Sequence, residues 1–219
     1  MIELQKRLLT SFLLLIIIYF SLIETTVLFF LFLAINYFSL IEFNNLFKKI
    51  FRKKKKFYFL SFLACVIYLF IFSLIIWNFL TPLSIKSTIS IIFIILICIT
   101  SDIGGFIFGK LVGGKKLTQI SPNKTYSGVF GSFFLSIISG HFYYIFFKNH
   151  LPFEIHYLIL ITIISFISQF GDLIISFLKR KANIKDSGSI LPGHGGILDR
   201  IDGVLIALPF GLVLTSILQ

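Results

Sequence analysis

Three aspartates lie within or at the start of apolar runs, where the charge of a carboxylate has to be compensated. Asp172 lies inside a long apolar run, and Asp199 and Asp202 stand at the start of the last apolar run of the chain. An ionised carboxylate at membrane depth requires a cation or a proton nearby, so each is a candidate functional residue. Carboxylate oxygens, completed by substrate phosphates, are the ligands that Mg²⁺ prefers. The three aspartates are therefore predicted to hold one or two cations, which could stabilise both oxygens in a displacement at phosphorus.

Asp172 is followed by Ser176 and Lys179 at spacings of four and seven residues. In a helix these spacings place the three side chains on one face. We therefore expect metal or substrate binding at this face. The alternative is a structural ion pair between Asp172 and Lys179, about two helical turns apart.

A glycine-rich turn, 191–196, leads into the helix that begins near Asp199. Its glycines let backbone N–H groups approach an anion, and the N-terminal end of the helix adds a favourable dipole. Asp199 and Asp202 are three residues apart and share one face of that helix. Ion pairing with Arg200 is the alternative to metal binding by this pair. His194, within the turn, is expected to contact phosphate or a carboxylate that lies behind the metal ligands, and a structural role is its alternative.

Cations and hydroxyls accompany these carboxylates along the chain. Arg offers a phosphate two parallel hydrogen bonds, whereas Lys acts as a mobile point charge. Asp186 is expected to orient the basic loop or to approach the metal. The residues predicted to bind substrate are Ser121, Lys124, Thr125, Ser176, Arg180, Lys185, Asp186, His194, Gly195 and Gly196, and those predicted to act in catalysis are Asp172, Lys179, Asp199, Arg200 and Asp202.

Two further segments leave their interpretation open. The segment 121–128 combines Ser, Lys and Thr at a helix entrance, which suits phosphate, but by itself it also matches an ordinary loop with a helix N-cap. Asp102 ends another apolar run, and a functional role for it stays open. Gly105 and Gly109 beside it form a small-xxx-small pattern, which favours close helix packing over catalysis.

The composition excludes an ordinary soluble domain. The 219 residues are 57% hydrophobic and 13% charged, with a mean hydropathy of +1.00, whereas soluble domains are about half apolar and a quarter charged. Because the apolar runs are long and continuous, helices are favoured over a barrel. We expect an all-α, polytopic integral membrane protein with about seven transmembrane helices, at 8–22, 26–43, 57–79, 87–108, 127–147, 155–178 and 197–218.

Positive charge is distributed unevenly along the chain. All but two of the 20 Lys and Arg residues lie at the N-terminus or in three segments, 44–56, 109–126 and 179–200. With seven spans these segments share one side, which the positive-inside rule makes the cytoplasm. This distribution explains the net charge of +11 without nucleic acid as a partner. The run 48–56 is expected to determine topology and to touch anionic lipid headgroups.

Polarity divides the chain near residue 84. The region 1–83, with about three spans, has almost no polarity inside the membrane, and no residue in it stands out as catalytic. Its first apolar run lacks a small-residue cleavage site and is expected to be retained rather than removed as a signal peptide. The region 84–219, with about four spans, contains all five aspartates and is expected to be catalytic. No disulfide is expected between Cys65 and Cys98, because both lie in predicted spans.

The segment 176–202 resembles the signature of the phosphatidate cytidylyltransferase (CDP-diacylglycerol synthase) family. The resemblance covers about 101–203 and includes the pair at 171–172 and the element at 121–125, in the proper order. It departs at 105–106, where members often have Ala-Tyr, and after Thr125, where they often have Trp and Glu or Gln. The matching signature residues are Ser176, Lys179, Arg180, Lys185, Asp186, Gly188, Pro192, His194, Gly195, Gly196, Asp199, Arg200 and Asp202.

This resemblance implies a nucleotidyltransferase that makes CDP-diacylglycerol and pyrophosphate from CTP and phosphatidate. It also implies a Mg²⁺-dependent site, in which a second cation could be monovalent, and a homodimer in the inner (plasma) membrane with its active site facing the cytoplasm. The N-terminal region is a span or two shorter than expected for the family, and activity is expected to survive because the motifs lie elsewhere.

Two other functions remain as alternatives. One is a CTP-dependent enzyme that acts on another lipid, either an isoprenoid alcohol kinase or an ether-lipid cytidylyltransferase. The other is a small ion-coupled transporter, which is less favoured because the polar residues gather on one face rather than along a transmembrane path.

Overall fold

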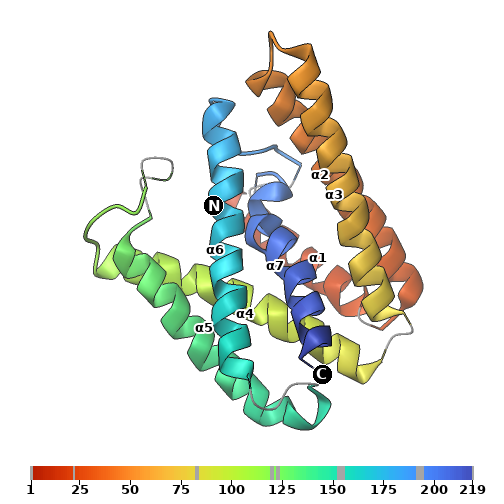
Figure 1. The fold of residues 1–219 in the computed structure, drawn as a ribbon, viewed down its shortest axis with the longest axis vertical. Coiled ribbons are helices and arrows are strands. Elements are labelled where there is room, and N and C mark those ends of the chain that lie inside the picture. Colours follow the sequence, from red (N-terminus) through yellow and green to blue (C-terminus); the bar gives the residue numbers. More distant parts are fainter. Residues whose placement is uncertain are drawn as a thin grey trace. The chain divides into compact units, whose positions relative to one another are not determined.

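Seven α-helices make up most of the chain in the computed structural model (Figure 1). The structure describes residues 2–21, 23–81, 84–118, 121, 124–151, 156–190 and 195–218. Within these ranges there is no strand, and Lys116 and Thr125 form an isolated β-bridge. The helices are α1 (Ile2–Ser21), α2 (Thr25–Ile50), α3 (Lys55–Leu80), α4 (Ile85–Leu111), α5 (Tyr126–Phe147), α6 (Tyr157–Lys181) and α7 (Leu198–Ile217), with a short 3₁₀ helix, η1 (Lys148–His150), after α5.

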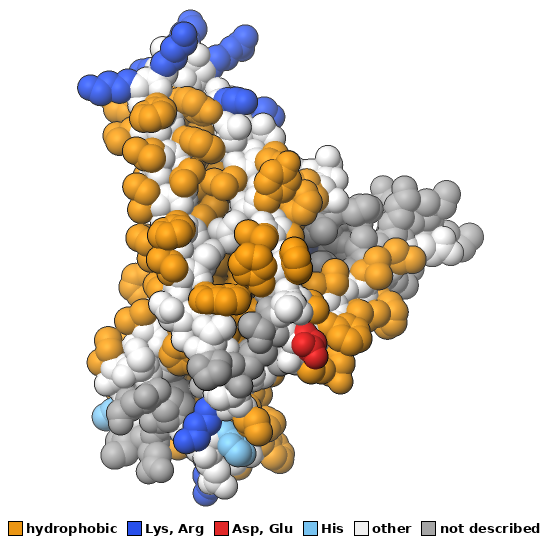
Figure 2. Space-filling view, turned by 90° about the vertical axis from the view of Figure 1, so that its right-hand side faces the viewer, with side chains coloured by type: hydrophobic (Ala, Val, Ile, Leu, Met, Phe, Trp, Pro, Cys, Tyr) orange, Lys and Arg blue, Asp and Glu red, His pale blue; other side chains and the backbone are white. Residues whose placement is uncertain are grey.

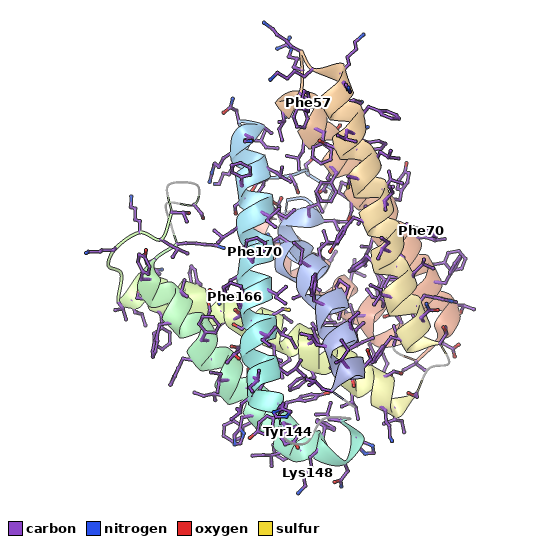
Figure 3. The ribbon with its side chains drawn as sticks, viewed as in Figure 1. Phe57, Phe70, Tyr144, Lys148, Phe166 and Phe170 are labelled. Atoms are coloured by element: carbon purple, nitrogen blue, oxygen red, sulfur yellow. The ribbon has the colours of Figure 1, made fainter. Side chains whose placement is uncertain are left out.

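A helix lies at each of the seven predicted spans, which confirms the all-α expectation. Among the described residues, the six helices α2 to α7 are long and apolar enough to cross a membrane. Many large apolar side chains on them stay exposed, including Phe57 and Phe70 on α3 and Phe166 and Phe170 on α6 (Figure 3). Exposed apolar side chains are stable against lipid tails, which are equally apolar. The chain is therefore a multi-pass membrane protein.

The residues form two compact units. The first contains Met1–Trp77 and Leu178–Ile201, and the second contains Asn78–Phe177 and Asp202–Gln219. The first unit therefore includes α1, α2, most of α3 and the loop between α6 and α7, whereas the second includes α4, α5 and most of α6 and α7. The division near residue 84 into an N-terminal and a catalytic region stays a prediction, because compactness does not show which part performs catalysis.

In the first unit, α2 and α3 run side by side as a hairpin (Figure 1). Asn36 Nδ2 donates a hydrogen bond to Ser73 Oγ at 2.7 Å, and Tyr58 OH donates to Asn44 Oδ1 at 2.7 Å. Polar contacts of this kind join helices inside an apolar environment. The hairpin carries the basic run 48–56 at its tip, where Figure 2 shows Lys and Arg side chains gathered beyond the apolar surface.

In the second unit, glycines bring α4 and α5 into close contact. A Cβ atom at Gly104 would overlap the backbone carbonyl of Gly131, and one at Gly128 would lie 2.9 Å from the carbonyl oxygen of Gly105. Gly109 lies 3.6 Å from the position of the same Gly128 Cβ. The packing role predicted for Gly105 and Gly109 is therefore confirmed. This contact sets the positions of Asp102 on α4 and of the loop that enters α5.

Candidate functional site

The second unit contains a cavity of about 300 Å³. Residues of α4, α5 and α6, and of the loop that precedes α5, form its walls. A concave site with a few convergent polar groups is the usual form of a small-molecule site. The polar side chains that line it are Asp102, Ser121, Lys124, Thr125, Ser132, Gln169 and Asp172.

Asp172 in this cavity has a cation beside it. Lys124 Nζ forms an ion pair with Asp172 Oδ2, and Ser176 Oγ donates a hydrogen bond to Asp172 Oδ1 at 3.2 Å. About a quarter of each charged side chain is exposed, 25% for Lys124 and 26% for Asp172. The cation that compensates the charge of Asp172 is therefore Lys124, from a different segment, rather than Lys179 of the same helix.

Local hydrogen bonds hold Lys124 in place. Leu117 N donates to Lys124 O at 2.8 Å, and Lys124 N donates to Ser121 O at 3.0 Å, so the loop folds back on itself. Thr125 is the N-cap of α5, where its hydroxyl accepts a hydrogen bond from Gly128 N at 3.1 Å. The plainer interpretation of this segment, a loop with an N-cap, therefore describes Thr125 well. Lys124 and Ser121 nevertheless line the cavity.

Oxygen donors on the cavity wall suit a hard cation. Asp102 and Asp172 supply carboxylates, and Gln169 supplies an amide oxygen. Such ligands are those that Mg²⁺ binds in proteins. Within either unit, however, the described residues include no group of three or more His, Cys, Asp or Glu placed to hold a metal ion. A cation here would therefore depend on oxygens from the substrate or from water.

Asp202 lies where α7 packs against α6. A Cβ atom at Gly171 would lie 2.7 Å from Asp202 O, and one at Gly203 would lie 2.5 Å from Ser168 Oγ. These two glycines let the helices touch at the residues next to Asp172 and Asp202. Asp202 Oδ1 accepts a hydrogen bond from Gly203 N at 2.9 Å. The structure therefore places these two predicted metal ligands on neighbouring helices, each beside a point of close contact.

Asp199, in the first turn of α7, has a different environment in the first unit. Lys179 Nζ donates to Asp199 Oδ1 at 2.7 Å, and the two side chains are only 15% and 9% exposed. Asp199 Oδ2 accepts from Ser187 N at 2.8 Å, from Ser187 Oγ at 3.0 Å and from Gly196 N at 3.0 Å. A shielded ion pair is stable only when further hydrogen bonds satisfy it in this way. Asp199 could bind a metal only by exchanging one of these partners.

The loop that surrounds Asp199 begins at a Schellman motif. Asn183 has a left-handed backbone conformation, with φ 54°, and its N–H donates to Arg180 O at 3.0 Å. Ile184 N donates to Lys179 O at 3.0 Å, which completes the motif and ends α6. The predicted substrate-binding and catalytic residues that remain exposed around this loop are Arg180, Lys185, Asp186 and Arg200.

Sequence reasoning missed Glu42, a residue of α2. Its side chain is buried, with 1% exposed, and it accepts hydrogen bonds from Ser187 Oγ at 2.6 Å, Ile197 N at 2.8 Å and Leu198 N at 3.0 Å. The residue pattern of 1–83 predicts no catalytic residue there. The signal that could have revealed it was the single carboxylate of a largely apolar helix.

Carboxylates of the protein itself therefore already accept hydrogen bonds from the backbone N–H groups at the start of α7. Gly196 N donates to Asp199, whereas Ile197 N and Leu198 N donate to Glu42. A carboxylate is favoured there because the helix dipole is positive at its N-terminal end. Phosphate binding by these N–H groups stays a prediction, and it would require displacement of a carboxylate.

The prediction for His194 concerns a residue outside the described ranges, as does the remainder of 191–194. Gly195 is described and has φ 85°, a left-handed conformation that favours glycine. A Cβ atom there would lie 3.2 Å from Asp199 Oδ2. Gly195 therefore lies next to the Asp199 carboxylate, and its contact with substrate stays a prediction.

The fold and these clusters define a class of protein: a multi-pass helical membrane protein with carboxylate–lysine pairs and exposed cations suited to phosphates. Residues 2–218 match the family model described as the cytidylyltransferase family, so the chain belongs to this family.

Several bacterial proteins named phosphatidate cytidylyltransferase are similar to the chain. That of Staphylococcus epidermidis is 47% identical over 121 residues, which cover 54% of the chain and 46% of the relative. That of Bacillus subtilis is 44% identical over 113 residues, covering 51% and 41%. That of Helicobacter pylori is 42% identical over 127 residues, covering 53% and 43%. The matched region thus spans less than half the length of each relative.

Proposed function

We propose that this chain is a CTP:phosphatidate cytidylyltransferase, which makes CDP-diacylglycerol and pyrophosphate for phospholipid synthesis. The observation that carries the proposal is the similarity, at 42%, 44% and 47% identity, to proteins of that name. The family match over 2–218 and the multi-pass fold support it. A membrane-embedded chain suits a reaction whose lipid substrate and lipid product both stay in the bilayer.

In the proposed reaction an oxygen of the phosphatidate phosphate attacks the α-phosphorus of CTP. The bond between this phosphorus and the oxygen that bridges to the β-phosphate breaks, and pyrophosphate leaves with that oxygen. The protein contributes positioning and neutralisation of charge rather than covalent chemistry. Arg180, Lys185 and Arg200, which are exposed, would bind phosphates, and Lys124 would do so from the cavity wall.

The proposal includes Mg²⁺ as cofactor, with one or two cations bound. Mg²⁺ would supply neutralisation of the phosphate charges. Asp172 fits this role by its place among oxygen donors in the cavity, and Asp202 fits it by its place on the adjacent helix. Asp199 is the third proposed ligand, on condition that a cation replaces Lys179 or a hydrogen-bond donor at its carboxylate.

The proposed setting is the inner (plasma) membrane, with the site facing the cytoplasm, where CTP is present. The concentration of Lys and Arg in alternate segments supports this orientation through the positive-inside rule. A homodimer is part of the proposal on the strength of the family resemblance alone.

The deciding experiment incubates the purified chain in detergent micelles with phosphatidate, CTP labelled at the α-phosphate and Mg²⁺. We expect the label in CDP-diacylglycerol and equimolar release of pyrophosphate. Parallel reactions contain an isoprenoid alcohol or an ether lipid in place of phosphatidate. Product from one of these lipids alone, or CDP as the nucleotide product, would overturn the proposal in favour of the corresponding CTP-dependent enzyme. CTP-independent uptake of a solute into sealed vesicles would instead favour a transporter.

A further inference from the structure

Glu42 is the one acidic residue of α2, and it lies among neutral hydrogen-bond donors. Its three donors are a serine hydroxyl and the first two N–H groups of the turn that starts α7. Among the described residues no ion pair is recorded for Glu42, and its side chain is 1% exposed. The donors and the positive end of the helix dipole therefore compensate its polarity.

Glycines of the loop between α6 and α7 leave space for the Glu42 carboxylate. A Cβ atom at Gly188 would lie 2.7 Å from Glu42 Oε1, and one at Gly196 would lie 2.5 Å from Glu42 Oε2. Either side chain would have to displace the buried carboxylate. Both glycines therefore have a packing role beside Glu42, and substrate binding by Gly196 stays a prediction.

Ser187 links Glu42 to the predicted catalytic residues. Its hydroxyl lies 2.6 Å from Glu42 Oε2 and 3.0 Å from Asp199 Oδ2, and its backbone N–H donates to Asp199 at 2.8 Å. A hydroxyl has a single proton to donate, so the two carboxylates share one donor. Asp199 in turn holds Lys179 at 2.7 Å. A chain of contacts thus leads from α2 to the end of α6, within one unit.

From this arrangement we infer that Glu42 is a positioning residue of the active site. It anchors Ser187 and the start of α7, and thereby fixes Asp199 and Lys179 in the geometry that the reaction requires. The inference rests on the proposed function and extends it to the N-terminal region, which supplies this anchor from a position 145 residues away from Ser187 in the sequence.

Glu42→Gln is the variant that tests the inference most directly. The amide keeps the shape but replaces one acceptor oxygen with an NH₂ group, which would face an N–H or hydroxyl donor of the loop. We expect kcat to fall about tenfold or more, with less than about a twofold change in the KM for CTP, because losing a hydrogen bond to a charged group in a buried site has effects of this size. Hydrogen–deuterium exchange should accelerate at Ser187, Ile197 and Leu198.

Glu24→Gln is the matched control. Glu24 is exposed at the start of α2 and makes no side-chain capping hydrogen bond, so its exchange and kinetics should equal those of the unsubstituted chain. Ser187→Ala is the second test variant, for use if Glu42→Gln does not fold. It removes the shared donor without altering a charge, and we expect the same pattern with smaller changes.

Three outcomes would overturn the inference. Unchanged kcat and unchanged loop exchange in both test variants would show that the anchor has no functional role. A lower KM for CTP in Glu42→Gln would show that Glu42 competes with phosphate at the helix start. A uniform rise in exchange along the whole chain would show a global effect on folding. If the unsubstituted chain makes no CDP-diacylglycerol, the proposed function fails, whereas the exchange measurement still decides whether Glu42 anchors the loop.

Discussion

The Asp172 cavity and the Asp199 cluster use the same two side-chain types in opposite ways. Asp172 pairs with Lys124 on the wall of a cavity of about 300 Å³, and about a quarter of each side chain is exposed. Asp199 pairs with Lys179 in a shielded position, and its second oxygen accepts three more hydrogen bonds. Asp172 therefore lies beside space for a ligand. The Asp199 carboxylate already accepts as many hydrogen bonds from the protein as its oxygens can accommodate.

This difference indicates that the Asp172 pair is suited to binding a ligand, whereas the Asp199 pair is suited to holding the surrounding loop in place. An ion pair beside a cavity can exchange its partner for a metal or a phosphate at small cost, since solvent already screens it. A shielded and fully bonded pair holds its surroundings in place, because breaking it leaves a buried charge. Identical residue types along the sequence therefore need not have identical roles.

The largest expected effect is that of Asp172→Asn. The change keeps the shape and removes the charge that suits the site to a cation, so turnover should fall about 100-fold or more together with the Mg²⁺ response. The measurement is the rate of CDP-diacylglycerol formation over a series of Mg²⁺ concentrations. The double variants Asp172→Asn with Lys124→Met, and Asp172→Asn with Lys179→Met, should show no recovery. Recovery of turnover in the Lys124 double variant would show that Asp172 has a structural role. The two carboxylate–lysine pairs would then not differ in function.

Asp202→Asn and Asp199→Asn should both lose most activity but differ in stability. Asp199→Asn leaves the shielded Lys179 without its carboxylate, which should destabilise the fold by ~3–5 kcal/mol. Asp202→Asn should destabilise the fold less, because the amide oxygen of Asn can still accept the hydrogen bond from Gly203 N. Thermal unfolding in detergent, measured beside the CTP assay, distinguishes them. Equal Tm values for the two variants would show that Asp199 is no more structural than Asp202, and full activity in both would remove the metal assignment.

Gly196→Ala sharpens the description of the Asp199 cluster. The added methyl group would meet the Glu42 carboxylate and the Ser187 hydroxyl, so we expect destabilisation by about 1–3 kcal/mol from overpacking. Ser189→Ala, in the same loop but exposed, is the control and should behave as the unsubstituted chain. Urea or thermal unfolding provides the measurement. A Gly196→Ala variant of normal stability would show that the loop around Glu42 can accommodate a methyl group at little cost.

The smallest effect is expected from cysteine labelling of two loops, which should leave activity unchanged. Arg52→Cys and His150→Cys are made singly, in a background without Cys65 and Cys98. Both positions are exposed and lie outside the predicted spans. An impermeant thiol reagent should label them from opposite sides of the membrane, because the basic segments are expected in the cytoplasm. Labelling from the same side would exclude the seven-span topology and the cytoplasmic orientation of the site.

The helices could be predicted because hydrophobicity is a local property. The expected span at 57–79 corresponds to α3 at Lys55–Leu80, and that at 127–147 corresponds to α5 at Tyr126–Phe147. Close packing at Gly105 and Gly109 was also predicted, since small residues at a spacing of four let helices approach closely in a membrane; the structure shows that the partner is α5. The positions of Asp172 and Asp202 within the helices followed from the same periodicity.

Residue type, spacing and apolar length thus determined from the sequence alone that this chain is a polytopic helical protein with a charged segment around Asp199. The tertiary structure decided which charges meet. Lys124 reaches Asp172 from a different segment, Lys179 serves Asp199, and Glu42 holds the start of α7 from 155 residues away. Hydrophobic periodicity specifies which face of a helix is apolar, but a hydrogen bond requires two groups within about 3 Å of each other. Only the packing of the helices determines that distance.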